Sequence, residues 1–334
     1  MDYKQITQEI DKKIFHPIYL LSGDEPYYID LIADHIEEHA LTEEEKGFNQ
    51  TIVYGKDSDV QSIIQMAKRY PMMSNHQVII IKEAQELKNV EHLYYYAQNL
   101  LPSTILVICY KYKKFPKTTK LAKLVQSKGL IFDSVRIPDY KIDSWIVNFV
   151  KEKSYKIDTS TAVLLGEHLG TELHKIVNEL SKLMSILPKN SIITKENIEK
   201  NIGISKDYNV FELSNAFGEK NILKVNRILH YFAVNSKDSK APMIIASLFS
   251  YFQKLLLLYF ITDKSNNGIS QTLGISPAPF IINKYKAAQK KYSAQKLASI
   301  ISILRAYDMK FKGVNASSSS QGELLKEMAF KILH

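Results

Sequence analysis

Residues 1–137 alternate short, continuously apolar segments with segments of helical periodicity. Strands that are buried on both faces read as continuous apolar runs, and a strand–helix alternation brings successive strands together in parallel. The pattern therefore predicts an α/β domain in which helices cover both faces of a parallel sheet. The predicted strands are residues 17–21, 51–54, 78–81, 104–109 and 130–135, and the predicted helices are residues 28–40, 57–69, 83–101 and 119–126.

The pattern changes at Pro138, because proline disfavours helix in the residue before it and strand-like runs almost cease beyond it. Helical periodicity marks residues 143–150, 160–169 and 171–187, a short helix beginning near Thr194, and then residues 213–217, 222–234, 242–261, 269–273, 279–288, 293–310 and 322–333. We expect Trp145 in the helical core. The predicted domains are 1–138, 139–204 and 205–334, and the last two are helical.

The first strand, turn and helix lie where an ATPase of this architecture carries its phosphate-binding loop. Here only Gly23 remains, Asp24 and the following glutamate would repel a phosphate, and no Gly-Lys-Ser/Thr occurs. The strand 78–81 ends in Lys82 and Glu83, where an ATPase would place a magnesium-binding aspartate at the first position. We therefore predict no catalytic residue, no cofactor and no metal, and a chain that works by binding partners. The alternative, an active ATPase, requires tight ATP·Mg binding.

The single cysteine and the lengths of the apolar segments limit the chemistry and the cellular location that we expect for the chain. Cys109 lies inside the predicted strand 104–109, which indicates a buried thiol with no disulfide or metal role. The first residues lack the pattern of a secretory signal, and apolar stretches are shorter than the ~18 residues that span a membrane. A cytoplasmic location is expected.

Positive charge is concentrated near one end of the chain. Residues 205–334 hold 18 Lys and Arg against 8 Asp and Glu, whereas residues 1–204 hold 26 against 27. This asymmetry indicates either a nucleic-acid contact or a lysine-rich solvated surface. Two tyrosines, Tyr285 and Tyr292, lie between lysines and could stack on bases. The candidate DNA-contacting lysines are Lys284, Lys286, Lys290, Lys291 and Lys312.

The segment between the second predicted helix and third strand has an unusual composition. It reads Tyr-Pro-Met-Met-Ser-Asn over residues 70–75, where polar turn residues are normal. Methionine is common at adaptable partner-binding surfaces. Met72 and Met73 therefore either form such a surface or plug the base of the sheet, and the residues alone leave both interpretations open.

Five segments in order resemble the delta subunit family of the bacterial DNA polymerase III clamp loader. The first is the hollow loop Leu-Leu-Ser-Gly-Asp-Glu-Pro-Tyr-Tyr of residues 20–28, and the second is Pro-Met-Met-Ser-Asn-His-Gln-Val-Ile of residues 71–79. The third pairs Gly-Thr-Glu-Leu at 170–173 with Asn-Glu-Leu-Ser-Lys-Leu at 178–183. The last two are Asn-Val-Phe-Glu-Leu at 209–213 and Asp-Met-Lys-Phe-Lys-Gly at 308–313. Together they span almost the whole chain.

The resemblance implies an AAA+ module, with an α/β domain and a helical lid, followed by a helical collar. It implies a subunit without its own catalysis in a nucleotidyltransferase complex, the DNA polymerase III holoenzyme. The implied partners are the sliding clamp (beta subunit), gamma/tau and delta-prime subunits in a heteropentamer, and primed DNA, with no membrane. The clamp would be bound through Met72 and Met73, which follow Pro71 and replace the usual Leu-Phe, and would thereby be opened. The alternative function is a stand-alone nucleic-acid-binding protein that uses the basic residues 205–334.

Overall fold

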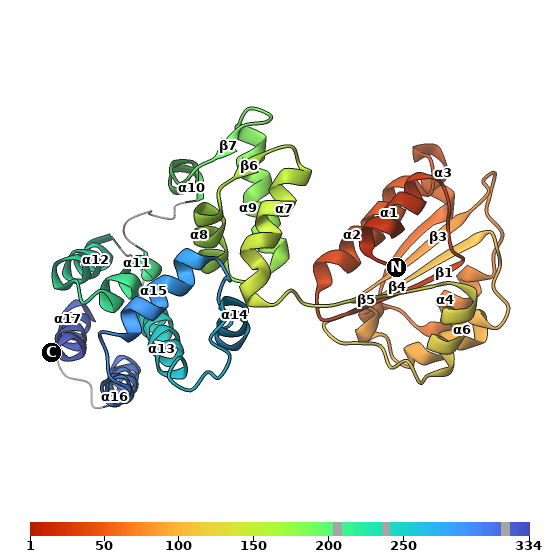
Figure 1. Ribbon diagram of the computed structural model, residues 1–334. Coiled ribbons are helices and arrows are strands. Elements are labelled where there is room, and N and C mark those ends of the chain that lie inside the picture. The colour runs from red at the N-terminus through yellow and green to blue at the C-terminus, as the bar shows by residue number, and fades with distance from the viewer. Residues whose placement is uncertain (203–208, 236–240, 315–320) are drawn as a thin grey trace. The chain divides into compact units, whose positions relative to one another are not determined.

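The computed structural model describes residues 1–202, 209–235, 241–314 and 321–334, which form two compact units, Met1–Ile137 and Pro138–His334 (Figure 1). The predicted boundary between residues 204 and 205 lies outside the described residues.

A five-stranded sheet forms the centre of the first unit, in the order β2-β3-β4-β1-β5. Every neighbouring pair is parallel, and the register sets Leu20 beside Ile108 on one side and Ile131 on the other. The predicted parallel sheet is therefore confirmed. Its strands are β1 (Ile18–Gly23), β2 (Gln50–Tyr54), β3 (Gln77–Lys82), β4 (Thr104–Lys111) and β5 (Leu130–Ser134).

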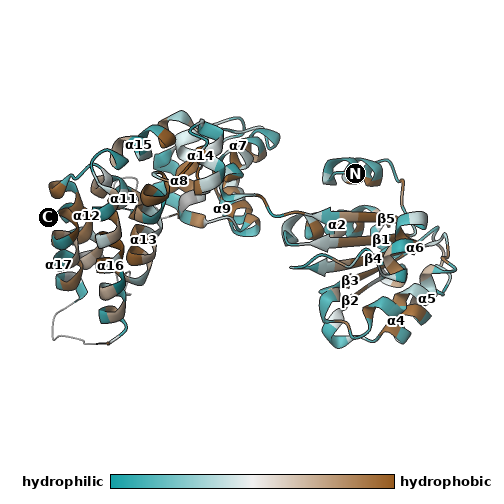
Figure 2. Ribbon diagram, turned by 60° about the horizontal axis from the view of Figure 1, so that its bottom comes forward, coloured by the Kyte–Doolittle hydropathy of each residue, from teal (hydrophilic) through white to brown (hydrophobic). Residues whose placement is uncertain are grey.

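Helices cover both faces of this sheet, as the alternation predicted (Figure 1). Successive side chains of a strand point to opposite faces, so Tyr19 and Leu21 pack with one set of helices and Ile18 and Leu20 with the other. The central strands are apolar over most of their length (Figure 2). One face carries α1 (Tyr3–Asp11) and α2 (Pro26–His39), the other carries α4 (Val60–Ala67) and α6 (Lys120–Lys128), and α3 (Glu43–Asn49) precedes β2.

The helix predicted over residues 83–101 is wrong. The chain there forms two short 3₁₀ turns, Ala84–Glu86 and Val90–Leu93, and one helical turn, α5 (Tyr94–Ala97). Glu83 and Asn89 have φ angles of 53° and 55°, in the left-handed region that a right-handed helix cannot contain. The apolar spacing in this segment serves packing against the sheet rather than a continuous helix.

Two helices of the first unit, α1 and α3, were not predicted from the sequence. Each begins with a reciprocal cap, in which a side chain three residues into the helix accepts a hydrogen bond from the backbone of the cap residue. The N–H of Asp2 donates to Gln5 at 3.0 Å, and the N–H of Thr42 donates to Glu45 at 2.9 Å. This Ser/Thr/Asp-x-x-Glu/Gln spacing was the signal available in the sequence.

Helices dominate the second unit. The first part holds α7 (Ile142–Glu152), α8 (Thr159–Leu169), α9 (Leu173–Ile186) and α10 (Lys195–Ile202), with a short parallel pair, β6 (Lys156–Ile157) and β7 (Ile192–Ile193). Trp145 is only half-buried and stacks on Phe149, with ring centroids 5.2 Å apart, because the inward face of α7 is formed by Ile142, Ile146 and Val150. The expectation of a core tryptophan is therefore wrong.

The remaining helices of the second unit enclose a single large apolar core. Phe217, Phe252 and Leu304 are among its fully buried members. Among the described residues, no helix is both long and apolar enough to span a bilayer. The helices are α11 (Val210–Gly218), α12 (Ile222–Asn235), α13 (Ala241–Leu257), α14 (Asn266–Leu273), α15 (Pro279–Gln289), α16 (Ala294–Phe311) and α17 (Gln321–Leu333).

Cys109 is buried in β4, as predicted. Burial raises the pKa of its thiol to about 12, so the thiol stays protonated near neutral pH. A buried, protonated thiol is a poor nucleophile and a poor metal ligand.

Candidate functional site

The loop between α4 and β3 presents its two methionines to solvent. The side chain of Met72 is 63% exposed and Met73 is fully exposed, and Tyr70 at the start of the loop is also exposed. Neither methionine plugs the base of the sheet, so that interpretation is wrong. Adjacent apolar side chains in water are unfavourable for the free chain and are typical of a surface that a partner covers.

A buried amide holds this loop from below. Asn49, the last residue of α3, is 4% exposed. Its side-chain Oδ1 accepts a hydrogen bond from the N–H of Met72 at 2.7 Å, and its Nδ2 donates to the carbonyl oxygen of Met72 at 2.9 Å. The two bonds fix the backbone of Met72 while its side chain stays free.

A second set of hydrogen bonds fixes the base of the loop. The side-chain amide of Gln77, at the start of β3, donates to the carbonyl oxygen of Ala67 at 3.3 Å and to the hydroxyl of Thr104 at 2.7 Å. The Thr104 hydroxyl in turn donates to the carbonyl of Ala67 at 2.9 Å. Between these anchors Met73 has a φ of 52°, a left-handed conformation that is uncommon outside glycine. Such strained residues cluster at functional sites.

The sequence interpretation missed Asn49 and its neighbour Phe48, which is 77% exposed. Asn49 lies far from the loop in sequence, and nothing in its local pattern indicates a contact with Met72. Phe48 is a large apolar side chain on a short, otherwise polar helix. This contrast was the signal in the sequence that could have indicated an exposed apolar side chain here.

The degenerate phosphate loop is closed by the protein itself. Gly23 has a φ of 143°, and a Cβ at this position would lie 1.9 Å from the carbonyl oxygen of Ser134 in β5. Close approach to β5 thus accounts for the glycine without any phosphate. Asp24 is exposed beside it.

The N-terminus of α2 is also unsuited to an anion. In a phosphate site, free backbone N–H groups at a helix N-terminus point at the ligand. Here the carboxylate of the N-cap residue Glu25, which is 4% exposed, accepts a hydrogen bond from the N–H of Tyr27 at 3.1 Å. Pro26 at the first helical position has no N–H to offer. The side chain of Glu25 therefore already occupies this helix end.

Ion pairs fill the edge of the sheet where a nucleotide's metal would lie. Lys82 Nζ lies 3.2 Å from Asp34 and 3.3 Å from Glu37, both on α2. Lys111 Nζ lies 2.7 Å from Asp30 and 2.8 Å from Glu83. Lys82 and Glu83 are thus structural partners of other charges.

The pKa values of this cluster follow from its pairing. Burial acts to lower the pKa of Lys111, but its hydrogen bonds to Asp30 and Glu83 outweigh burial and raise the pKa above the ordinary value. Burial acts to raise the pKa of Glu83, but hydrogen bonds from Lys111 and Gln85 outweigh it and leave the pKa lowered. Both groups therefore remain charged at neutral pH.

The candidate lysines of residues 205–334 lie in different settings. Lys284, Lys286 and Lys290 belong to α15 or its C-cap, and Lys284 and Lys290 are exposed. The ammonium of Lys291 donates to the backbone carbonyl of Glu219 at 2.8 Å, and Lys312, after α16, pairs with Asp308 at 2.6 Å. The structure thus groups the first three on one helix and gives the other two structural partners.

The tyrosines between these lysines do not form a stacking platform. Tyr292 is 2% exposed, and its hydroxyl donates to the carbonyl oxygen of Phe217 within the helical core. Tyr285 is half-buried and packs against Tyr251, with ring centroids 5.2 Å apart. The expectation that Tyr292 could stack on a base is wrong, because the bend between α15 and α16 turns its ring into the helical core.

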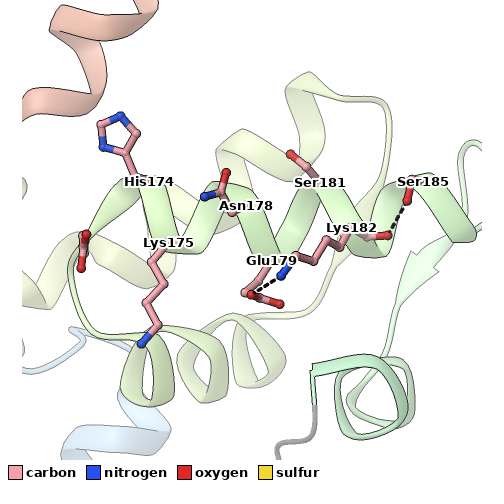
Figure 3. A pocket seen from close by; sticks show the side chains of 8 residues that line it. His174, Lys175, Asn178, Glu179, Ser181, Lys182 and Ser185 are labelled. Carbon is pink, nitrogen blue, oxygen red and sulfur yellow. Dashed lines mark hydrogen bonds and ion pairs between the residues drawn. The ribbon is translucent and has the colours of Figure 1, made fainter.

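A shallow depression along α9 contains no convergent chemistry (Figure 3). Its lining side chains come from this helix and its N-cap Glu172, and Lys182 pairs with Glu179 at 2.8 Å. The Ser185 hydroxyl donates to the carbonyl of Lys182 at 2.8 Å. One helix face with internally paired charges is an ordinary solvated surface.

The parallel sheet covered by helices and the helical second unit define an AAA+-like fold, in which the first strand–helix turn lacks Gly-Lys-Ser/Thr and the loop between α4 and β3 carries exposed methionines. Residues 19–134 match the family model for the DNA polymerase III delta subunit, and residues 207–328 match that for the C-terminal domain of the same subunit. The chain belongs to the delta subunit family of the DNA polymerase III clamp loader.

Individual relatives agree with this assignment. The DNA polymerase III subunit delta of Bacillus subtilis is 23% identical over 318 residues, covering 92% of this chain and 91% of that protein. A probable subunit delta of Aquifex aeolicus is 22% identical and covers 87% and 85% of the two chains. The solved structure of the Bacillus subtilis DNA clamp loader delta protein superposes with a TM-score of 0.62 at 20% identity and covers 99% of each chain.

Proposed function

We propose that this chain binds the ring-shaped sliding clamp through Met72 and Met73 and opens it for loading on primed DNA. The observation that supports this proposal is the exposure of two adjacent methionines on a loop whose backbone the buried Asn49 holds. A few apolar anchors that enter a pocket dominate the energy of most protein interfaces. Rigid support lowers the entropy that such a loop loses on binding.

Opening follows from a difference in affinity. A clamp ring exchanges between a closed form and a sprung form, in which one subunit interface is open. A ligand shifts this equilibrium only by the difference between its affinities for the two forms. The loop binds the sprung form more tightly and thereby populates it. Neighbouring subunits that use ATP then control access to the loop.

The second unit provides the assembly surface in this proposal. Leu223, Phe260 and Phe330 are 63%, 73% and 64% exposed on or just after the helices of residues 205–334. Large exposed apolar side chains are typical of interfaces in permanent complexes. The proposed neighbours are gamma/tau and delta-prime subunits in a cytoplasmic heteropentamer. The lysines of α15 would face primed DNA in that assembly.

Replacing both methionines by alanine tests clamp binding directly. Burial of a methionine side chain contributes roughly 1.5–3 kcal/mol. Because ~1.4 kcal/mol is tenfold, the double variant M72A/M73A, which loses two such side chains, should bind the clamp at least about 100-fold more weakly. Its melting temperature should match the wild type, because both side chains are exposed. Surface plasmon resonance with the clamp gives the affinity, and calorimetry gives the stability.

Met309→Ala is a matched control, since Met309 is a partly exposed methionine on α16. It should leave clamp affinity unchanged. A double variant that unfolds more easily but keeps its clamp affinity would contradict the proposal.

The proposal also includes no use of ATP by this chain alone. Glu25 and Pro26 occupy the helix end that would hold a phosphate, and Lys82 occupies the position of a metal ligand. Titration of the chain with ATP and magnesium in a calorimeter should therefore give no binding heat, with an ATP-hydrolysing loader subunit as positive control. Magnesium-dependent micromolar binding would contradict this part of the proposal.

A further inference from the structure

The corner where α1 ends beside the end of α2 brings together three side chains that are typical ligands of transition metals. Asp11 is the last residue of α1, and His35 and His39 lie one helical turn apart near the end of α2. One ligand atom from each residue can be chosen so that all three lie within 4.8 Å of one another. Neither the degenerate nucleotide site nor the methionine loop includes any of these residues.

We propose that Asp11, His35 and His39 form a binding site for a divalent transition-metal ion, with Zn²⁺ as the probe that fits best. Two imidazoles and one carboxylate with an open fourth position match the ligand set of tetrahedral zinc sites. Ligand atoms around such an ion lie about 3.3–3.6 Å apart when the bonds are about 2.0–2.2 Å long. Small side-chain rotations therefore bring the three atoms to bonding distance.

The hydrogen bonds of the two imidazoles prepare them for this role. His39 Nδ1 lies 3.0 Å from the carbonyl oxygen of His35. A carbonyl oxygen can only accept, so Nδ1 carries a proton in this contact, and Nε2 is the ring nitrogen left to bind a metal ion. Metal-binding histidines generally donate their other ring N–H to a carbonyl or carboxylate in this way.

The Nε2 atom of His35 already points at the carboxylate of Asp11. His35 Nε2 lies 2.7 Å from Asp11 Oδ1, and the two imidazole rings lie 4.1 Å apart. As a metal ion binds at Nε2, the proton that lies between His35 and Asp11 would leave to solvent or move to Nδ1 of the same ring. The carboxylate and the imidazole would then both become ligands.

The charges around the site act in opposite directions: the end of the α2 helix dipole favours a bound cation, and a nearby lysine weakens its binding. His39 is the last residue of α2, where the helix dipole is negative. The ammonium of Lys13, however, donates to the carbonyl oxygen of His39 at 2.5 Å and adds a positive charge to the same corner. Asp11 is exposed and both histidines are half-buried, so an ion can reach the site from solvent.

Binding at this site would join the ends of two helices. The inner sides of α1 and α2 already pack together through residues that include Ile6 and Ile10. A metal ion would add a second, polar connection at their C-terminal ends. The expected consequence is protection of α1 against local opening, which hydrogen exchange measures.

Zn²⁺ titration of the full chain tests this inference. After chelator treatment, calorimetry should show one Zn²⁺ per chain, and His39→Asn or His35→Asn should weaken binding at least tenfold. Asp11→Asn should weaken it several-fold, because one ligand loses its charge. Zn²⁺ at a concentration that saturates the wild type should raise its melting temperature and slow amide exchange in residues 3–11, with a much smaller effect in His35→Asn and His39→Asn, whereas Mg²⁺ should do neither.

His16→Asn is the matched control. His16 also pairs with a carboxylate, Glu9 at 3.2 Å, but the described part of the chain brings no third metal-binding side chain to this pair. The control variant should bind Zn²⁺ as the wild type does. Wild-type Zn²⁺ affinity in His35→Asn and His39→Asn, both of which should keep the metal-free melting temperature, would overturn the inference, as would the absence of a saturable site.

Discussion

Asn49 uses both ends of its side-chain amide on the backbone of one residue, Met72. Each hydrogen bond of this kind contributes a net ~0.5–1.5 kcal/mol to stability. The arrangement places structural support and partner recognition in separate residues. Support comes from a buried polar side chain, and the proposed recognition comes from exposed apolar ones.

Asn49→Ala should therefore lower the free energy of unfolding by about 1–3 kcal/mol and weaken clamp binding several-fold, because the loop loses its fixed geometry. Asn49→Asp should be intermediate, since a carboxylate still accepts from the Met72 N–H but cannot donate to its carbonyl. Urea denaturation and clamp binding measure the two effects. Asn99→Ala, at an exposed asparagine in the same unit, should change neither. Unaltered clamp affinity in Asn49→Ala would show that loop geometry is unimportant.

At this scale the sequence predicts what depends on local composition. Two methionines in a turn-like segment stand out, and Cys109 in an apolar run is correctly placed in the core. Tyr292 and Asn49 were inaccessible to the same reasoning. Their roles depend on hydrogen bonds to Phe217 and Met72, residues distant in sequence that only tertiary folding brings near.

At the scale of elements, a cluster of paired charges joins the ends of β3 and β4 to one side of α2. It lies where an ATPase of this fold would hold the metal of its nucleotide. Lys111 is central to it, with a side chain that is 9% exposed between Asp30 and Glu83. Removing one partner of a buried ion pair leaves uncompensated charge, which costs about 3–5 kcal/mol when burial is complete. Partial exposure of the two carboxylates reduces that cost.

Lys111→Met should destabilise the chain by about 2 kcal/mol at pH 7, for this reason. The pKa of Glu83 is lowered in the folded state, so its contribution is present above the unfolded pKa of about 4.3 and disappears as the pH falls through the folded value. The difference between the variant and the wild type should therefore shrink below pH 4. Urea denaturation at pH 7 and pH 3.5 measures it, with the exposed Lys114→Met as control. A difference that is constant with pH would contradict the ion-pair account.

The sequence predicts most elements because strand burial and helical spacing leave periodic patterns. It fails at residues 83–101, where left-handed Glu83 and Asn89 interrupt an apolar spacing that looks helical. It also could not reveal that Lys111 and Asp30 meet. The missing phosphate machinery is visible in the residues, but the charges that replace it come from separate elements.

For the whole molecule, the asymmetric charge is the feature with consequences in solution. Residues 205–334 carry ten more positive than negative side chains, counted as 18 against 8. The exposed Lys290, at the end of α15, is the residue we propose for phosphate contact. Phosphate contacts make affinity for DNA fall steeply with salt, independently of base sequence.

Lys290→Glu in the assembled loader should weaken binding to primed DNA and reduce the slope of log affinity against log salt by about 1, the value for one lost phosphate contact. Lys326→Glu, at an exposed lysine of α17, makes the same charge change in the same helical array and should leave the slope nearly unchanged. Fluorescence anisotropy over a salt series measures both. Equal slopes in Lys290→Glu and the wild type would show that Lys290 makes no phosphate contact and is an ordinary solvated residue.

The two hydrogen bonds from the Asn49 side chain reach main-chain atoms of Met72 and leave the Met72 side chain out. Under the proposed role, the side chain at position 72 can therefore change with the pocket of a partner at little cost in stability. Position 73 is more restricted, because its left-handed φ of 52° disfavours β-branched residues and proline. Recognition by this loop could in this way change over evolution while its support by Asn49 stays the same.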